Sequence, residues 1–357
     1  MGKLSGITVI DLTQFLPGPM MTVIMADHGA RVIKIEPPGG EPVRSQAPFE
    51  NGQSVWFTQL NRGKESRQLD LKSEAGKAEL RALIGEADVF VEGFRPGVMA
   101  RLGFDYASVK ALNQGIVYCS ISAFGQTGAM AHHPAHDMAV QALAGFLSVN
   151  DGPDGMPVVP GAPSADLAAG TTALAAVLMA LLGRERTGEG DYLDIAMFDS
   201  LLPWCAHTAG SAIAGGAAPL SRKQRSLGGA GFYQVFVTSD CKHVVLGGRE
   251  LKFARNLLTA LGREDLLPFA EAEAGQQGPL IVFLRETFAT RTRDEWVVWF
   301  TDKDVAFAPV LDFREALDEP HVAERGLLVE SEGRHHIASP IRFASEPGFV
   351  AGKVPEL

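Results

Sequence analysis

The sequence of 357 residues predicts an α/β protein with a parallel sheet, followed by a smaller α+β domain. Over residues 7–195, short apolar runs alternate with helical patterns, which is typical of βαβ units. A stretch of small residues at 214–231 then changes the composition, and a hairpin pattern follows it. We therefore expect a large domain at 1–213, a linker at 214–231, a small domain at 232–318 and a segment at 319–357 that returns to the large domain.

The composition excludes several classes of partner. The chain is 46% hydrophobic and 21% charged, which is ordinary for a soluble globular protein, and its formal net charge is −10. Nucleic acid and anionic membrane surfaces are therefore not expected as partners. The uncharged stretch Leu167–Leu182 has sixteen residues, fewer than the ~20 of a membrane-spanning helix, so we expect an internal helix.

The cysteines and the N-terminus indicate a cytoplasmic protein. Cys119, Cys205 and Cys241 are odd in number and widely spaced, so they predict neither a disulfide framework nor a metal site. The N-terminal sequence M-G-K-L-S-G-I-T-V-I has no long apolar region after its lysine and does not read as a signal peptide.

The first predicted unit is a strand at 7–12, a helix at 20–28 and a strand at 31–36. Such a βαβ unit is typical of dinucleotide-binding domains. The first turn, however, reads L-P-G-P-M-M instead of G-x-G-x-x-G, and a proline replaces an amide that a pyrophosphate would need. A nicotinamide dinucleotide is therefore not the expected ligand.

The remaining elements follow in order. Residues 37–66 are rich in proline, glycine and charge and predict a long loop. The expected strands and helices are then a strand at 67–71, a helix at 73–87, strands at 88–92 and 116–124, a helix at 167–186, a strand at 192–195, a helix at 196–213, a hairpin of 232–237 and 243–246, helices at 250–261, 277–290 and 293–302, and a strand at 341–343.

Four polar side chains directly follow predicted strands, namely Lys72, Arg95, Arg101 and Gln126. The carboxyl ends of parallel strands meet at one edge of a sheet, where ligands bind. Each of these side chains alone is best interpreted as solvated. Together, three cations at one edge of an acidic protein predict a site for a phosphorylated ligand.

Two acid/base side chains, His136 and Asp166, stand just before apolar helical runs. Helix starts carry unpaired N–H groups and favour negative charge, which suits an anion or a developing enolate. The alternative interpretation is structural, with Asp137 and Asp166 as helix caps and His136 as a loop residue.

The motifs resemble those of the family III CoA-transferases and the related α-methylacyl-CoA racemases. The resemblance rests on L-S-G-I-T-V-I-D-L with P-G-P, D-H-G-A-R-V-I-K-I-E-P-P, L-D-L-K-S, V-E-G-F-R-P-G with R-L-G, G-Q-T-G, R-T-G-E-G with D-I-A-M-F-D-S, and D-E-P-H-V-A-E-R. It implies a Rossmann-like large domain and a small domain in an interlocked homodimer. It also implies acyl-CoA thioester substrates and no prosthetic group.

The resemblance assigns roles residue by residue. It implies CoA binding by Phe15, Lys34, Asp70, Leu71, Lys72, Glu92, Gly93, Arg95, Arg101, Gly125 and Gln126. Asp166 matches an aspartate that is the nucleophile in the transferases and a proton carrier in the racemases. His136 and Asp137 match the H-D pair of the racemases, and Glu250 matches a glutamate that pairs with the histidine.

We therefore expect a racemase or epimerase that inverts the α-carbon of a 2-methylacyl-CoA thioester. His136 and Asp166 would exchange the proton on opposite faces, Glu250 would orient His136, and the backbone N–H of Asp137 would bind the enolate oxygen. The alternative is CoA transfer between carboxylic acids through an acyl anhydride at Asp166. The residues after His136-Asp137 and around Asp166 are closer to the transferases. A third possibility is a non-catalytic CoA-binding protein.

Overall fold

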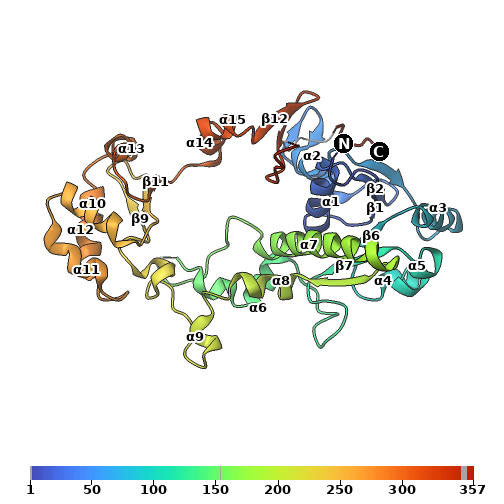
Figure 1. The fold of residues 1–357 in the computed structure, drawn as a ribbon, viewed down its shortest axis with the longest axis horizontal. Coiled ribbons are helices and arrows are strands. Elements are labelled where there is room, and N and C mark those ends of the chain that lie inside the picture. Colours follow the sequence, from blue (N-terminus) through green and yellow to red (C-terminus); the bar gives the residue numbers. More distant parts are fainter. Residues whose placement is uncertain (1, 153, 347–351) are drawn as a thin grey trace. The chain divides into compact units, whose positions relative to one another are not determined.

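The computed structural model describes residues 2–152, 154–346 and 352–357, which form two compact units (Figure 1). Unit 1 contains the described residues of Met1–Ala144, Pro160–Trp204 and Glu319–Leu357, and unit 2 those of Gly145–Val159 and Cys205–Asp318. Residues 145–159 and 205–213 thus belong to unit 2, whereas the sequence prediction assigned them to the large domain. Within the predicted segment 319–357, residues 347–351 lie outside the described residues.

A six-stranded sheet, parallel at every pairing, forms the centre of unit 1, in the order β5-β2-β1-β6-β7-β8. Its strands are β1 (Thr8–Asp11), β2 (Arg31–Glu36), β5 (Glu65–Gln68), β6 (Val89–Glu92), β7 (Val117–Ser122) and β8 (Tyr192–Ala196). Numbered by appearance in the chain, this is the order 3-2-1-4-5-6 of dinucleotide-binding domains. The strand order reverses between β1 and β6, and such a reversal opens a crevice at the carboxyl ends of the strands.

The predicted α/β fold of this region is confirmed, with one strand displaced. β5 lies at Glu65–Gln68 and not at 67–71. The prediction followed the apolar Leu69 and Leu71, but β5 is an edge strand, and an edge strand can be polar. Leu69 is buried just after the end of β5, where it packs in the apolar core that the strands share with neighbouring helices.

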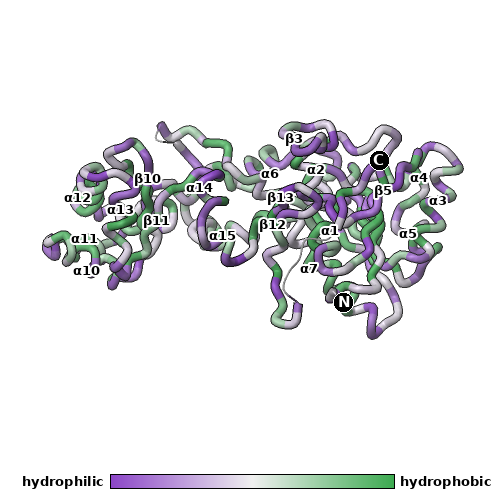
Figure 2. Tube along the Cα trace, turned by 90° about the horizontal axis from the view of Figure 1, so that it is seen from above, coloured by the Kyte–Doolittle hydropathy of each residue, from purple (hydrophilic) through white to green (hydrophobic). Residues whose placement is uncertain are grey.

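Helices cover both faces of the sheet. One group packs around α1 and α7 and comprises α1 (Pro17–Asp27), α2 (Val55–Asn61), α6 (Asp137–Leu143), α7 (Ser164–Thr187) and α8 (Met197–Trp204). The other group comprises α3 (Glu74–Gly85), α4 (Val98–Leu102) and α5 (Tyr106–Leu112), which share an apolar core with the strands. α7 approaches α1 closely at Gly170, where a Cβ would lie 2.7 Å from the carbonyl oxygen of Pro17. Figure 2 shows apolar stretches where α1 and the sheet lie.

The predicted loop at 37–66 contains structure that the sequence pattern did not reveal. It includes the single-turn helix η1 (Pro42–Ser45), the short hairpin of β3 (Phe49–Glu50) and β4 (Gln53–Ser54), and α2. The side chain of Ser54 caps α2 by accepting a hydrogen bond from the N–H of Phe57 (3.4 Å). α2 has too few residues to show a helical period, and its exposed Trp56 obscures the pattern further.

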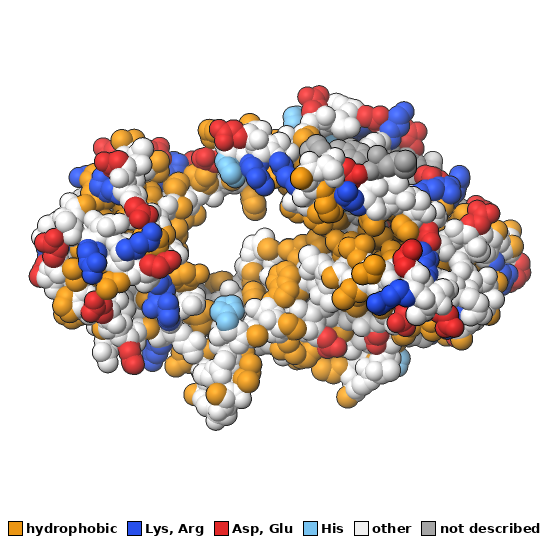
Figure 3. All heavy atoms as spheres, in the orientation of Figure 1, with side chains coloured by type: hydrophobic (Ala, Val, Ile, Leu, Met, Phe, Trp, Pro, Cys, Tyr) orange, Lys and Arg blue, Asp and Glu red, His pale blue; other side chains and the backbone are white. Residues whose placement is uncertain are grey.

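α7 has 24 residues, Ser164–Thr187, and confirms the helix predicted at 167–186 with a start three residues earlier and an end one residue later. Among the described residues, α7 is the one helix that is both long enough and apolar enough to cross a membrane, judged by length and composition alone. One face, which includes Ala165, Ala169 and Leu174, is buried in unit 1. The opposite face exposes Met179 and Leu182, and apolar side chains gather in this region of the surface (Figure 3).

Unit 2 is built around a three-stranded antiparallel sheet of order β11-β10-β9, which confirms the predicted hairpin. Its elements are η2 (Phe146–Val149), α9 (Gly210–Ile213), the irregular turn η3 (Arg225–Gly229), β9 (Gln234–Val237), β10 (His243–Leu246), α10 (Leu251–Ala260), η4 (Glu264–Leu266), α11 (Leu267–Glu271), α12 (Gly278–Phe288), α13 (Arg293–Phe300), β11 (Phe307–Pro309) and α14 (Phe313–Leu317). The helix predicted at 196–213 is confirmed only for its first part, because α8 ends just after Pro203 and α9 is a separate turn.

The chain then returns to unit 1 through α15 (Pro320–Glu324) and the antiparallel hairpin of β12 (Leu328–Ser331) and β13 (Arg334–Ile337). This hairpin was not predicted. The predicted strand at 341–343 is wrong, since only an isolated bridge joins Phe343 to Glu346.

Candidate active site

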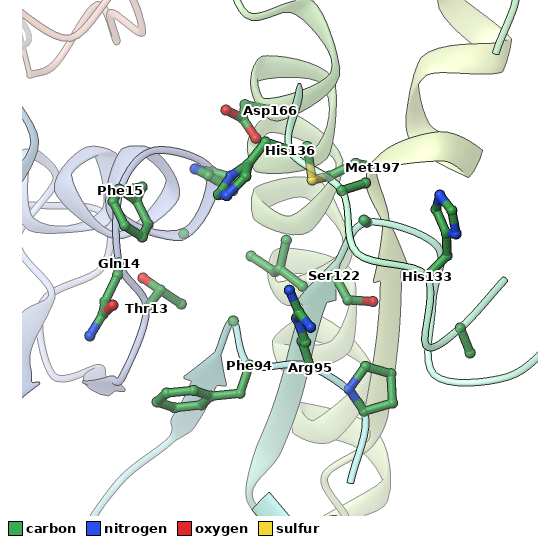
Figure 4. Close-up of a pocket in the computed structure, with 18 residues that line it drawn as sticks. Thr13, Gln14, Phe15, Phe94, Arg95, Ser122, His133, His136, Asp166 and Met197 are labelled. Atoms are coloured by element: carbon green, nitrogen blue, oxygen red, sulfur yellow. The ribbon is translucent and has the colours of Figure 1, made fainter. Parts of the chain in front are cut away.

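A cavity of about 220 Å³, here called cavity 1, opens where the strand order reverses. Segments that follow β1, β6 and β7 form much of its wall, and the starts of α6 and α7 close it. Its lining residues are Thr13, Gln14, Phe15, Pro17, Gly18, Gly93, Phe94, Arg95, Pro96, Ile121, Ser122, Ala123, Ala131, His133, Ala135, His136, Asp166 and Met197. In Figure 4, Asp166 and His136 lie together, and the guanidinium of Arg95 points toward the same space. The structure thus brings together the two predicted acid/base residues.

Asp166 lies in the first turn of α7, and its side chain is partly buried. Burial, together with the negative charge of Asp137, raises the pKa of the Asp166 carboxyl to about 7. A carboxyl with such a pKa exists in both protonation states near neutral pH. It can therefore act as a nucleophile, a base or an acid without a large change of pH.

Asp137 caps α7 from a neighbouring helix. Its Oδ1 accepts hydrogen bonds from the backbone N–H groups of Ala165 (2.8 Å) and Asp166 (3.2 Å). Its Oδ2 accepts a hydrogen bond from the side-chain amide of Gln141, one turn later in α6. The carboxylate thus has the capping role of the structural interpretation, but it caps α7 and not its own helix, while the role of the backbone N–H toward an enolate stays a prediction.

His136 is the N-cap residue of α6, and its side chain caps no helix N–H. The ring is exposed, and the ring of Phe15 meets it edge-on with the centroids 6.2 Å apart. Glu250, the predicted partner of His136, is the exposed N-cap residue of α10 in unit 2. Their pairing therefore stays a prediction.

Phe15 and Lys34 are linked through a buried carboxylate. Phe15 has a φ of 65°, a left-handed conformation that is unusual for an aromatic residue, and its N–H donates a hydrogen bond to Glu41 Oε1 (2.7 Å). The ammonium group of Lys34 lies 2.6 Å from Glu41 Oε2 and also bonds the carbonyl of Thr13 (3.0 Å). Lys34 is fully buried and lines none of the three cavities described here, so its charge supports the wall of cavity 1, and its predicted contact with CoA stays a prediction.

A second cavity, cavity 2, of about 510 Å³ lies beyond the ends of β2 and β5. Three of the predicted CoA-binding residues, Asp70, Leu71 and Lys72, line it. Gln14 and Phe94 line both cavity 1 and cavity 2, so the two cavities are neighbours at the same edge of the sheet.

A third cavity, cavity 3, of about 260 Å³ is lined by Glu92 and Gln126, and Arg95 lies between it and cavity 1. Glu92 is almost fully buried, and burial raises the pKa of its carboxyl to about 7. Of the other predicted CoA-binding residues, Gly93 lines cavity 1, while Gly125 and Arg101 line none of the three cavities.

The model of CoA-transferase family III matches residues 4–357. The chain belongs to this family. The acetyl-CoA:oxalate CoA-transferase of Acetobacter aceti is 37% identical to it, over 96% of this chain and 90% of the relative. The human α-methylacyl-CoA racemase is 33% identical, over 92% of this chain and 83% of the relative.

Solved family III structures agree with the fold. A CAIB/BAIF family protein from Brucella suis has a TM-score of 0.86 and 29% sequence identity, and it covers 100% of this chain and 96% of that protein. The predicted family is thus correct, and the chain is an enzyme of family III. The named transferase is more similar to it than the named racemase, which reverses the preference that the H-D pair suggested.

Sequence reasoning missed Glu41, which supports Phe15 from a segment that was predicted as loop. It named Asp137 but missed that this side chain caps a helix that begins 27 residues later. The sequence held one signal for the capping role of Asp137. The residues at the start of α7 read P-S-A-D, and the N-cap residue, a proline, has no side chain that can cap the helix. His133 and Ser122 also line cavity 1, and no motif singled them out.

Proposed function

We propose that this protein is a CoA-transferase that moves CoA between carboxylic acids, with Asp166 as the nucleophile. One observation carries the proposal. Asp166 presents a partly buried carboxyl with a raised pKa to a cavity at the strand reversal of a family III enzyme. A carboxylate that is poorly solvated and basic is a better nucleophile than an ordinary surface aspartate.

The neighbouring cavities suggest how the thioester lies. Cavity 2 has a largely apolar lining that includes Leu12, Ile35 and Leu69, with Lys72 also in its wall, which suits the adenosine end of CoA. The pantetheine arm would cross Gln14 and Phe94, which both cavities share. The thioester would then reach Asp166 in cavity 1.

The chemistry conserves atoms without water or a cofactor. An Asp166 carboxylate oxygen attacks the thioester carbon, the C–S bond breaks, and CoA thiolate and a mixed anhydride result. The thiolate attacks the aspartyl carbonyl, which releases the donor acid and leaves CoA on Asp166 as a thioester. The acceptor carboxylate attacks this thioester to form a second anhydride, and the thiolate then attacks its acyl carbonyl. These steps give the new acyl-CoA and the free Asp166 carboxylate.

The test is transfer of labelled CoA from an acyl-CoA to added acids, for a panel that includes acetate, oxalate and succinate. Hydroxylamine should trap the activated carbonyl of Asp166 as a hydroxamate, found by mass spectrometry in that peptide. We expect Asp166→Asn to abolish both signals. Transfer that survives this substitution would refute the nucleophilic role.

The racemase is the second candidate, because His136 and Asp166 line the same cavity. It predicts exchange of the α-proton of a 2-methylacyl-CoA in deuterated water. His136→Ala separates the candidates, since it should stop exchange and largely spare CoA transfer. Loss of transfer with normal folding in this variant would give His136 a role in the transferase chemistry.

We also propose that the working enzyme is an interlocked, cytoplasmic homodimer. Glu250 of one copy would complete the active site of the other copy. Support comes from the exposed apolar face of α7, where Met179 is 67% exposed. Mixed dimers test it. A chain with His136→Ala and a chain with Glu250→Ala, each inactive in proton exchange, should recover part of that activity when combined. No recovery, with mixing verified by mass, would refute a shared site.

A further inference from the structure

We infer that the side chain of Asp137 is a positioning residue, which caps α7 from outside and holds the Asp166 carboxyl at the wall of cavity 1. The inference rests on the proposed function in one respect, namely that Asp166 is the reacting carboxyl. It differs from the role of the Asp137 backbone N–H toward an enolate, because it concerns the carboxylate and not the amide.

α7 has no cap within its own segment. The preceding residue, Pro163, has no side-chain donor or acceptor, and the hydroxyl of Ser164 donates to the carbonyl of Ala162. The N–H groups of the first turn would therefore lack partners. Asp137 Oδ1 accepts from two of them, those of Ala165 (2.8 Å) and Asp166 itself (3.2 Å).

The carboxylate of Asp137 is in turn held by α6. Gln141, one turn later in α6 and only 1% exposed, donates its amide N–H to Oδ2. Its other amide atom, Oε1, has no hydrogen-bond partner among the described residues. The hydrogen bonds from Gln141 to Asp137 and from α7 to Asp137 connect two helices. One is α6, which starts at His136, and the other is α7, which carries Asp166.

The charge of Asp137 has opposite effects on the helix and on Asp166. A negative charge at the start of a helix is favourable for the helix, but it disfavours ionisation of a carboxyl beside it. The other ionisable groups that line cavity 1 with Asp166 are Arg95, His133 and His136. Burial, with the charge of Asp137 added to it, therefore raises the pKa of Asp166 and keeps it partly protonated near neutral pH, against the lowering effect that the helix start would have.

Two substitutions separate the cap from the charge. Asp137→Asn keeps an oxygen that can accept from α7, and Gln141 can rotate so that its free Oε1 accepts from the new amide. It removes only the charge. Asp137→Ala removes both the charge and the cap.

The readout is the rate at which a carbodiimide modifies Asp166, measured by mass spectrometry as a function of pH. The modification needs a proton, because the carboxyl oxygen adds to the carbodiimide carbon while a nitrogen of the reagent takes up the proton. In Asp137→Asn we expect the midpoint to fall by about one pH unit with little change in thermal unfolding. In Asp137→Ala we also expect a faster plateau rate at low pH, because the carboxyl is less well held, and a Tm lower by about 2 °C.

The matched control is Asp312, which caps α14 in unit 2 by accepting from the N–H of Glu315 (2.8 Å) and lines none of the three cavities. Asp312→Asn and Asp312→Ala should leave the Asp166 midpoint unchanged. An unchanged midpoint in Asp137→Asn would overturn the inference. Failure of hydroxylamine trapping with a shifted carbodiimide midpoint would refute the nucleophile and leave the positioning role of Asp137 standing.

Discussion

Two aspartates near the crevice show how the surroundings of a carboxylate decide its use. Asp11 ends β1, is fully buried, and faces the ammonium of Lys64 at 3.0 Å. Burial alone would raise its pKa, but Lys64, Lys34 and two threonine hydrogen bonds hold it well below the usual range. Asp166 is less buried, yet its pKa is raised, because burial raises it and the negative charge of Asp137 adds to that effect.

The comparison indicates which carboxylate is structural and which can react. Asp11 accepts hydrogen bonds from the N–H of Thr13 (2.9 Å) and the hydroxyl of Thr22 (2.6 Å), so its oxygens are occupied. Asp166 instead lines cavity 1, where its carboxylate lies beside His136. A carboxylate whose oxygens are all engaged with cations and donors holds the fold together. One without a cation partner, open to a cavity, remains available to a substrate.

The largest expected effect on stability follows from breaking the buried ion pair of Asp11 and Lys64. Asp11→Asn leaves the fully buried ammonium of Lys64 without its counter-ion, and we expect unfolding in urea to require about 3–5 kcal/mol less free energy. Asp11→Asn combined with Lys64→Met should recover part of the loss. A loss below about 1 kcal/mol in the single variant would show that the buried pair does not stabilise this fold. In the wild type, the contribution of Asp11 is present above about pH 4 and falls at lower pH, because its folded pKa lies below its unfolded value.

Substitution of Asp166 should change the free energy of unfolding in the opposite direction to substitution of Asp11. The folded pKa of Asp166, about 7, lies above its unfolded value of 3.8, so its burial costs more stability as pH rises from about 4 to about 7. Asp166→Asn should therefore stabilise the protein at pH 8, on the order of 2 kcal/mol, while it abolishes CoA transfer. The gain should be smaller at pH 5. An equal gain at both pH values would mean that the raised pKa is not its cause.

Phe15 lines cavity 1, and its backbone N–H donates a hydrogen bond to the buried carboxylate of Glu41. Phe15→Gly should remove the strain of its left-handed backbone, but the ring is only 41% exposed and its burial is lost, so we expect a net change in the free energy of unfolding of no more than about 1 kcal/mol. The KM for acyl-CoA should rise several-fold as the wall of cavity 1 is lost. An unchanged KM would remove Phe15 from the predicted CoA-binding set.

The smallest effect is expected at an exposed ion pair. Arg31 and Glu65 are joined by two hydrogen bonds between β2 and β5, but both side chains are about half exposed. Arg31→Gln should change the free energy of unfolding by less than about 1 kcal/mol. A loss as large as that of Asp11→Asn would show that burial is not what distinguishes the two pairs.

The parallel α/β region, the family, and the candidate pair His136 and Asp166 could all be predicted from the sequence. Each of these follows from local patterns, namely apolar runs of strand length, motifs in a fixed order, and acid/base residues at helix starts. Such patterns are visible because a strand or a helix start is specified by residues close together in the chain.

The role of each charged side chain, in contrast, became clear from the folded chain. Lys34 follows the pattern of a CoA ligand, yet it is buried beside Glu41, and Asp137 caps a helix that begins 27 residues after it. The raised pKa of Asp166 likewise depends on burial and on Asp137. These properties arise when distant segments pack together and exclude water. Because burial and charge neighbours act through space, the order of residues alone does not reveal them.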